Sequence, residues 1–242
     1  MTRTQAGVAY SNTADRAELQ LEGQLLGTGG VPATNAINNN TPFTALFTNT
    51  NVINYGLTNF GGTKGWFTND DVSNGTNQYS DQMFPGTSIV GPSKVAFEVT
   101  TFVVLKAGIN RFGVKSSDGF RLTAGSALAK AKQTVVIGSF DGSRGEQVPS
   151  EGAFLVYQDG LYAFRLVYFK GGNTDVRLEW YSRVTDIEFV NDSFKVGDRT
   201  LINGLDTNLE TPTPAYQQRT VEPVVAQPTI TVVNQNQQVA LS

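Results

Sequence analysis

The chain has 242 residues, with 18 basic and 21 acidic side chains, a net charge of −3, and neither cysteine nor histidine. This composition excludes thiol nucleophiles, Ser-His-Asp triads, histidine general bases, and zinc or copper sites built from imidazole or thiolate. The basic residues are scattered, so no surface for nucleic acid is predicted, and no apolar run is long enough for membrane insertion.

Only 16 % of the residues are charged, whereas Asn, Thr, Ser and Gly are abundant. This balance is common in secreted bacterial β-proteins, because hydroxyl and amide side chains suit strand surfaces and turns. Residues 1–16 lack the apolar region of a signal peptide. We therefore expect an extracellular or cell-surface protein, in a mature form or as a fragment.

The first predicted element, at residues 14–26, is ambiguous. Asn12 or Thr13 could cap a short helix, but apolar residues alternate between Ala17 and Leu21 as in a strand. We favour the strand. Residues 27–92 are rich in Gly, Asn, Thr and Pro, which predicts short strands joined by long loops.

From residue 94 onward the strand pattern becomes stronger. Strands are predicted near 95–105, 111–115, 120–124 and 134–137, followed by three consecutive strands within 154–182. Regular strands at this spacing are typical of an antiparallel sandwich or barrel.

The three consecutive strands are separated by the turn sequences Gln158-Asp159-Gly160 and Gly171-Gly172-Asn173, and Gly160 is expected to take a positive φ. In the middle strand, alternate residues from Tyr162 to Tyr168 are apolar and predict the core face. In the last strand, Leu178 and Trp180 are assigned to the core, and the alternate residues Arg177, Glu179 and Tyr181 are expected to meet water.

After Leu205 the composition changes. Four of the nine prolines lie in this segment, Tyr216 is its single aromatic residue, and short strands are predicted at 229–233 and 238–241. We predict a β-sandwich domain at residues 1–204 and an extended C-terminal arm at 205–242. We also expect contacts outside the arm to hold it in place.

Two motifs carry a resemblance to a known family. The sequence FGVKSSDGFRL at 112–122, followed by YAFRLVYFKGG at 162–172, resembles the β-sandwich domain named after anthrax protective antigen and shared with yeast flocculins. The resemblance covers roughly residues 84–181. It implies an all-β, antiparallel, jelly-roll-like sandwich, in agreement with the strand pattern.

The resemblance also implies a calcium-assisted sugar site. Sugar-binding members of the family hold calcium with two adjacent aspartates joined by a cis peptide, and the matching positions here are Ser117 and Asp118. The loop after Gly172 supplies Asn173 and Asp175 as further candidate ligands. Because Ser117 replaces the first carboxylate, the site has one negative charge fewer with which to bind calcium.

The residues themselves leave a simpler interpretation open. In Asp118-Gly119 the aspartate side chain can bond to following backbone N–H groups, and Gly119 is expected to take a φ that other residues resist. The alternative to a metal or sugar contact is therefore an Asp118 that only forms the turn. Asp70 and Asp71 form the only adjacent acidic pair, which is either a solvated loop or a second source of calcium ligands.

Aromatic residues near the Gly- and Asn-rich loops are candidates for stacking on sugar rings. Trp66 and Tyr79 are the main ones, with Phe67 and Phe84 beside them, and core packing is the alternative for each. Calcium is the one cofactor that these candidate residues suggest.

Three functions follow from these observations. The leading hypothesis is a non-enzymatic extracellular structural or adhesive subunit, whose arm adds a strand to copies of itself or to other surface proteins. The alternative is a calcium-assisted carbohydrate-binding module that recognises glycans. A glycosidase is the third, but nothing in the spacing of Glu98, Glu179 and Glu188 pairs two carboxylates.

Overall fold

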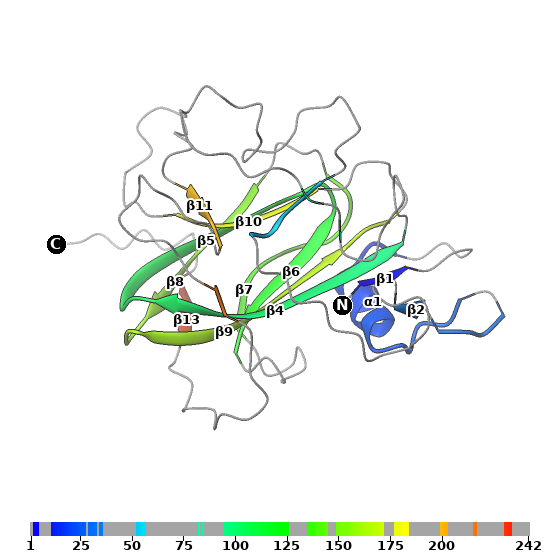
Figure 1. Ribbon diagram of the computed structural model, residues 1–242, viewed down its shortest axis with the longest axis horizontal. Coiled ribbons are helices and arrows are strands. Elements are labelled where there is room, and N and C mark those ends of the chain that lie inside the picture. Colours follow the sequence, from blue (N-terminus) through cyan, green and yellow to red (C-terminus); the bar gives the residue numbers. More distant parts are fainter. Residues whose placement is uncertain are drawn as a thin grey trace.

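The described residues form an antiparallel β-sandwich with a short helix against the outside, as the computed structural model shows (Figure 1). The structure describes residues 2–4, 11–27, 29–32, 34–35, 52–56, 82, 84, 94–125, 135–144, 149–171, 177–183, 199–202, 215–216 and 230–233. The sequence therefore predicted the fold class correctly. In the described part, no helix is both long and apolar enough to cross a membrane.

The first sheet is built around two long central strands. Its order is β2 (Thr34–Asn35), β1 (Thr2–Thr4), β4 (Val95–Leu105), β9 (Gly160–Phe169), β6 (Gly119–Ala124) and β7 (Val135–Phe140), and β12 (Ala215–Tyr216) also pairs with β4.

The second sheet faces the first and is likewise antiparallel. Its order is β11 (Arg199–Leu201), β10 (Arg177–Arg183), β5 (Gly108–Ser116), β8 (Pro149–Val156) and β13 (Ile230–Val233), and β3 (Asn54–Gly56) also pairs with β10.

The core lies between the sheets and is rich in aromatic rings. Alternate residues of β9 from Tyr162 to Tyr168 are buried there, as their period of two predicts. Phe164 packs against Trp180 and Phe112 of the second sheet, with ring centroids 6.1 and 5.1 Å apart. Such pairs contribute about 0.5–1.5 kcal/mol each beyond their buried area. Phe84 also lies in this core, stacked on Tyr168 at 5.2 Å.

The strand predicted at residues 14–26 is wrong, because Ala14–Leu21 forms the helix α1. Thr13 is its N-cap, with extended backbone and a side-chain oxygen that accepts a hydrogen bond from the Arg16 N–H. Ala14, Ala17 and Leu21 recur at helical spacing and pack on Val167 and on other residues of the first sheet. Ala17 and Leu21, which suggested a strand, therefore belong to the apolar face of a helix.

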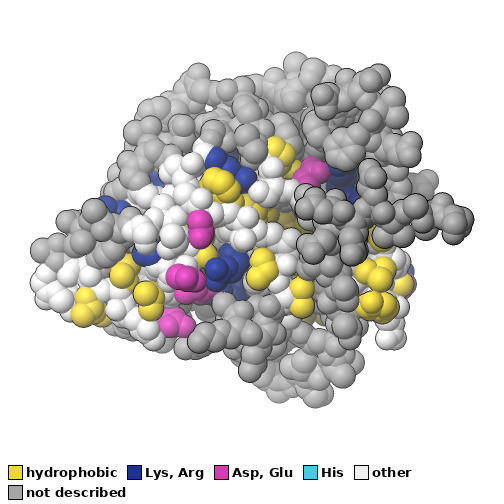
Figure 2. All heavy atoms as spheres, turned by 180° about the vertical axis from the view of Figure 1, so that it is seen from behind, with side chains coloured by type: hydrophobic (Ala, Val, Ile, Leu, Met, Phe, Trp, Pro, Cys, Tyr) yellow, Lys and Arg dark blue, Asp and Glu magenta, His cyan; other side chains and the backbone are white. Residues whose placement is uncertain are grey.

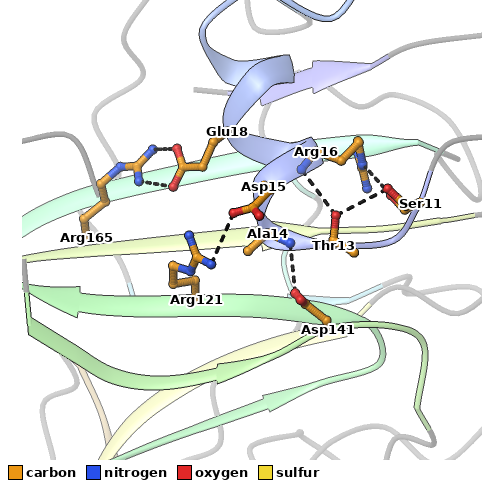
Figure 3. A network of polar contacts seen from close by, with 9 residues as sticks. All are labelled: Ser11, Thr13, Ala14, Asp15, Arg16, Glu18, Arg121, Asp141 and Arg165. Atoms are coloured by element: carbon orange, nitrogen blue, oxygen red, sulfur yellow. Dashed lines mark hydrogen bonds and ion pairs between the residues drawn. The ribbon is translucent and has the colours of Figure 1, made fainter. Parts of the chain in front are cut away.

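Polar contacts hold α1 on the outer face of the first sheet (Figure 3). Arg165 of β9 donates two hydrogen bonds to the Glu18 carboxylate, at 2.6 and 2.7 Å, and one of 2.6 Å to Glu98 of β4. Burial alone would lower the pKa of Arg165, but the two carboxylates outweigh it and raise that pKa above its ordinary value. At the helix start, the Ala14 N–H donates to Asp141 at 2.9 Å.

The outer face of β10 is also buried, which corrects the expectation that Arg177, Glu179 and Tyr181 meet water. The Tyr181 ring lies over Gly113 of β5, where an added Cβ would be 2.1 Å from the ring. Its hydroxyl donates to Glu151 of β8 at 2.8 Å. Alternation thus identified the inner face of this strand but not the covering of its outer face.

The side of the molecule that faces away from the viewer in Figure 1 carries charged and hydrophobic side chains together (Figure 2). Figure 2 shows acidic and basic side chains of the described residues next to one another near the middle, with exposed hydrophobic side chains scattered around them. This mixture agrees with the scattered charges in the sequence.

The predicted positive φ at Gly160 and Gly119 is wrong, because neither is among the glycines in the left-handed region. Gly160 begins β9 in extended conformation. Gly119 is needed for space instead: an added Cβ would lie 2.0 Å from the Phe169 ring.

The described parts of the C-terminal segment form strands on both sheets of their own chain. In β12, Ala215 pairs with Val103, and in β13, Ile230 to Val233 pair with Val156 to Ala153. The strand predicted at 229–233 thus coincides with β13, whereas 238–241 lies outside the described residues. The domain boundary at 204 stays a prediction.

Candidate functional site

The candidate site is built on the β5–β6 turn, which contains Ser117 and Asp118. The Ser116 hydroxyl donates to the Asp118 carbonyl at 2.7 Å and closes the turn. The Ser117 N–H donates to the Arg177 carbonyl of β10 at 3.2 Å, which extends the pairing of β5 and β10 by one residue. The peptide bond between Ser117 and Asp118 is trans.

The Asp118 carboxylate is fully buried and joins three distant segments. Its Oδ1 accepts hydrogen bonds from Asn12 Nδ2 at 2.9 Å and from the Ser143 hydroxyl at 2.8 Å, with the Gly171 N–H at 3.5 Å. Its Oδ2 lies 3.5 Å from the Ser117 hydroxyl. We call Asp118, Asn12, Ser143 and Gly171 the Asp118 cluster. Hydrogen bonds to a charged group contribute about 1.5–3 kcal/mol each, so this cluster anchors the segment before α1.

Two further described residues, Gly171 and Arg177, contact this turn. Gly171 belongs to the Asp118 cluster, and the Arg177 N–H donates to the Ser117 hydroxyl at 3.1 Å. The predicted ligands Asn173 and Asp175 lie between these two residues in the sequence and outside the described residues. The fold therefore places Gly171 and Arg177 beside the Ser117-Asp118 turn, and the roles of Asn173 and Asp175 stay predictions.

Arg144, which is partly buried, bonds to two strands of the second sheet close to the same turn. Its guanidinium donates to the carbonyls of Ser116 and Val114 on β5, at 3.0 and 3.3 Å, and to the Ser150 hydroxyl on β8 at 2.8 Å. It also lies 4.6 Å from the ring centroid of Phe140 on β7. Burial lowers the pKa of Arg144.

Of the site residues predicted from sequence, the structure places Asp118 alone. Trp66, Tyr79, Asn173, Asp175, Asp70 and Asp71 lie outside the described residues, as does Phe67. Phe84, a secondary stacking candidate, belongs to the core. Glu98 and Glu179 lie on strands of different sheets, and Glu98 is bonded to Arg165.

The described surroundings of Asp118 do not by themselves fit a calcium ion. Calcium takes six to eight oxygen ligands with enough negative charge to offset dehydration. Around Asp118 Oδ1, by contrast, an amide, a hydroxyl and a backbone N–H all point their hydrogens at the carboxylate. No three metal-binding side chains come together among the described residues. The calcium prediction thus depends on Asn173, Asp175, Asp70 and Asp71, and it stays a prediction.

Sequence reasoning missed Asn12, Ser143 and Arg144. Asn12 was considered only as a helix cap, and its role depends on contact with a residue 106 positions away. Ser143 and Arg144 follow the Asp141-Gly142 pair, which is a turn signal. Such a signal indicates a loop, but it does not indicate which residues the loop contacts.

No protein-family model and no curated protein matches the chain. Among the solved structures that are similar to part of this chain are the following three. They are the PA14 domain of the antifreeze protein MpAFP (16 % identity, TM-score 0.33, 39 % of this chain and 45 % of that one), the PA14 sugar-binding domain from an RTX adhesin (22 %, 0.31, 38 % and 47 %), and the A domain of epithelial adhesin 9 from Candida glabrata in complex with Galb1-3GlcNAc (13 %, 0.35, 57 % and 63 %).

The matches span about half to three fifths of the length of those chains. PA14 domains are related to the protective-antigen fold that the sequence motifs resemble. A likeness of this extent identifies neither a family nor a ligand for this protein.

Proposed function

We propose that this protein is a non-enzymatic, extracellular or cell-surface module with an adhesive or structural role, which assembles with copies of itself or with other surface proteins by strand addition. The observation that carries the proposal is the pairing of β12 with β4 and of β13 with β8. Two short strands of one C-terminal segment thereby occupy edges of both sheets.

Strand addition of this kind needs no specialised side chains. Backbone N–H and C=O groups on a sheet edge bind any extended segment in the right register, and alternate side chains provide specificity. Ile230 and Val232 pair in register with Val156 and Phe154, both of which lie in the core. A neighbouring copy carries the same segment, so the pairing made within one chain can be made between two.

Truncation tests this proposal with a matched control. A chain ending at Leu205 lacks β12 and β13, whereas a chain ending at Val233 keeps both. We expect light scattering coupled to size exclusion to find assemblies of the full chain and of the longer truncation, but not of the shorter one. Assembly of the shorter chain, or a full chain that stays monomeric at all concentrations, would refute the proposal.

Carbohydrate binding, assisted by calcium, is the second candidate, and one observation favours it. The Ser117-Asp118 turn contacts Gly171 and Arg177, the described residues on either side of Asn173 and Asp175 in the sequence. Carboxylate and amide oxygens such as those of Asn173 and Asp175 suit sugar hydroxyls or a calcium ion.

The test should leave Asp118 intact, because its loss would also disturb the fold. Asp175→Asn and Asn173→Ala meet this condition. If this function is right, calcium raises the melting temperature of the wild type but not of Asp175→Asn, and the variants lose binding on a glycan array. If calcium and chelator leave both melting and binding of the wild type unchanged, the candidate is eliminated.

A further inference from the structure

The strand β13 of the C-terminal segment lies beside both sheets of the sandwich. It pairs with β8, the neighbour within its own sheet, and it also lies next to β7, the last strand of the other sheet. The strand β12, by contrast, pairs over two residues with β4. Of the two described strands in this segment, β13 is therefore the one that lies at a rim of the sandwich where both sheets end.

The place that β13 occupies borders the core. Phe154 of β8 is 0 % exposed, and its ring packs against Phe112 with centroids 5.0 Å apart. At Gly152 the backbone of β8 already lies against the Ile137 carbonyl of β7, and the pairing with β13 covers the next residues of β8, 153–156. We call the edge of β8 at 153–156, together with the adjoining part of β7, the β13 slot.

The sequence of β13 suits this slot. Its four residues, Ile230 to Val233, are all β-branched and uncharged, as is typical of strands. An extended segment binds a sheet edge mainly through backbone hydrogen bonds, and its alternate side chains add specificity. The same segment from a second copy of the chain fits the slot equally well, because it brings the same backbone and the same side chains.

We infer that β13 is the strand that two copies exchange, so that the β13 of each copy leaves its own slot and enters the slot of its neighbour. The inference rests on the proposed function and specifies the donated strand and its acceptor. Residues 217–229 separate β12 from β13, and an extended chain of that length spans about 40 Å. β13 can therefore change partners while β12 stays paired with β4.

Exchange has a clear energetic consequence. Every contact that β13 makes with β8 and β7 is made again in the neighbour, so the exchanged and single forms differ mainly in the entropy of association. Exchanged copies should therefore prevail at high protein concentration. Because each β13 must leave its slot before another enters, assembly should also be slower than an encounter of preformed surfaces.

A disulfide lock tests the inference directly, since the chain has no cysteine of its own. Leu155 and Thr231 are register partners on β8 and β13, at a Cα separation of about 4.5–5.5 Å that a disulfide spans. We expect Leu155→Cys/Thr231→Cys, oxidised as a dilute monomer, to stay monomeric in light scattering when concentrated, and to assemble after reduction. The matched control is Val104→Cys/Leu161→Cys, exposed register partners on β4 and β9, which should assemble in both states.

The same variant, oxidised only after assembly, shows which copy supplies the strand. Disulfides between copies give covalent dimers or larger species on a denaturing, non-reducing gel, whereas disulfides within copies give monomers. An assembled fraction that yields only monomers, or assembly of the locked variant, would overturn the inference. Both results leave assembly itself in place, whereas a full chain that stays monomeric at all concentrations refutes the proposed function.

A measurement on the wild type needs no substitution in the protein. A synthetic peptide of residues 228–236, in large excess, should compete for the vacated slot and lower the assembled fraction of the full chain. The same peptide with Val232→Pro should not compete, because proline cannot donate a backbone hydrogen bond to the sheet. An assembled fraction that the first peptide leaves unchanged would contradict exchange of β13.

Discussion

The side-chain amide of Asn12 donates a hydrogen bond of 2.9 Å to the Asp118 carboxylate, across 106 positions of sequence. Asp118 also accepts from Ser143, and the Asn12 carbonyl accepts from the Gly142 N–H at 2.8 Å. One buried turn residue thereby joins the segment before α1, the loop after β7 and the end of β9. The aspartate of the family-like motif is accordingly a structural anchor in this protein.

Replacing Asp118 should therefore destabilise the whole domain. Asp118→Ala leaves the Asn12 amide and the Ser143 hydroxyl without their acceptor, which should lower the free energy of unfolding by about 2–3 kcal/mol. Asp118→Asn keeps an acceptor oxygen and should cost less. Urea denaturation at neutral pH measures both, and equal stability of Asp118→Ala and wild type would contradict the anchoring role.

Gly152 of β8 lies against the backbone of β7, a strand of the other sheet. An added Cβ at Gly152 would be 2.5 Å from the Ile137 carbonyl oxygen, and backbone cannot move aside as a flexible side chain can. We expect Gly152→Ala to cost about 1–3 kcal/mol through overpacking. Gly138→Ala is the matched control, because its Cβ would make ordinary contact with Phe120 at 3.7 Å. Thermal unfolding of both variants checks the prediction, which fails if they melt together.

Docking of α1 should depend on the ion pair between Arg165 and Glu18. Glu18→Gln removes a charge from a largely buried pair that Arg165 also shares with Glu98, and breaking such a pair costs about 3–5 kcal/mol when no charge replaces the lost one. The remaining Glu98 should reduce this cost. We expect faster amide exchange in α1 for Glu18→Gln.

Asp15→Asn is the control for this experiment. Asp15 pairs with Arg121 at 3.5 Å, but its side chain is 90 % exposed, and exposed pairs contribute about 0–1 kcal/mol. Equal exchange rates in the two variants would show that Arg165 does not hold the helix.

The ends of β4 and β8 are linked by a contact that should respond to acid. Asp159 accepts hydrogen bonds from Lys106 Nζ at 2.7 Å and from the Ala107 N–H at 2.8 Å, and these bonds lower its pKa. Because the pKa of Asp159 is lower in the folded state, its hydrogen bonds stabilise the fold at pH values above the unfolded pKa of about 3.9. This stabilisation is lost as pH falls through the lower, folded pKa.

Melting temperatures of wild type and Asp159→Asn between about pH 2 and pH 6 measure this effect. The advantage of the wild type should shrink toward the acid end, and also at high salt, because the pair is largely exposed. A difference that grows on acidification would contradict the assignment.

Much of the sandwich could be predicted because strand alternation is a local signal. The inner faces of β9 and β10 were identified from Tyr162 to Tyr168 and from Trp180, and the resemblance located the Ser117-Asp118 turn. Prediction failed where a second surface covers a strand. Tyr181 was expected to meet water, and Ala14–Leu21 was expected to be a strand, because the partners of both segments are far away in sequence.

The sequence by itself determined the class of fold, since a period of two in apolar residues forces extended chains to bury one face against another sheet. It also excluded chemistry that depends on histidine or cysteine. Only the tertiary structure decided that Asp118 is held by Asn12 and Ser143, and that β13 pairs with β8 and lies beside β7. The physical reason is that these contacts depend on the docking of segments distant in sequence, which no local pattern encodes.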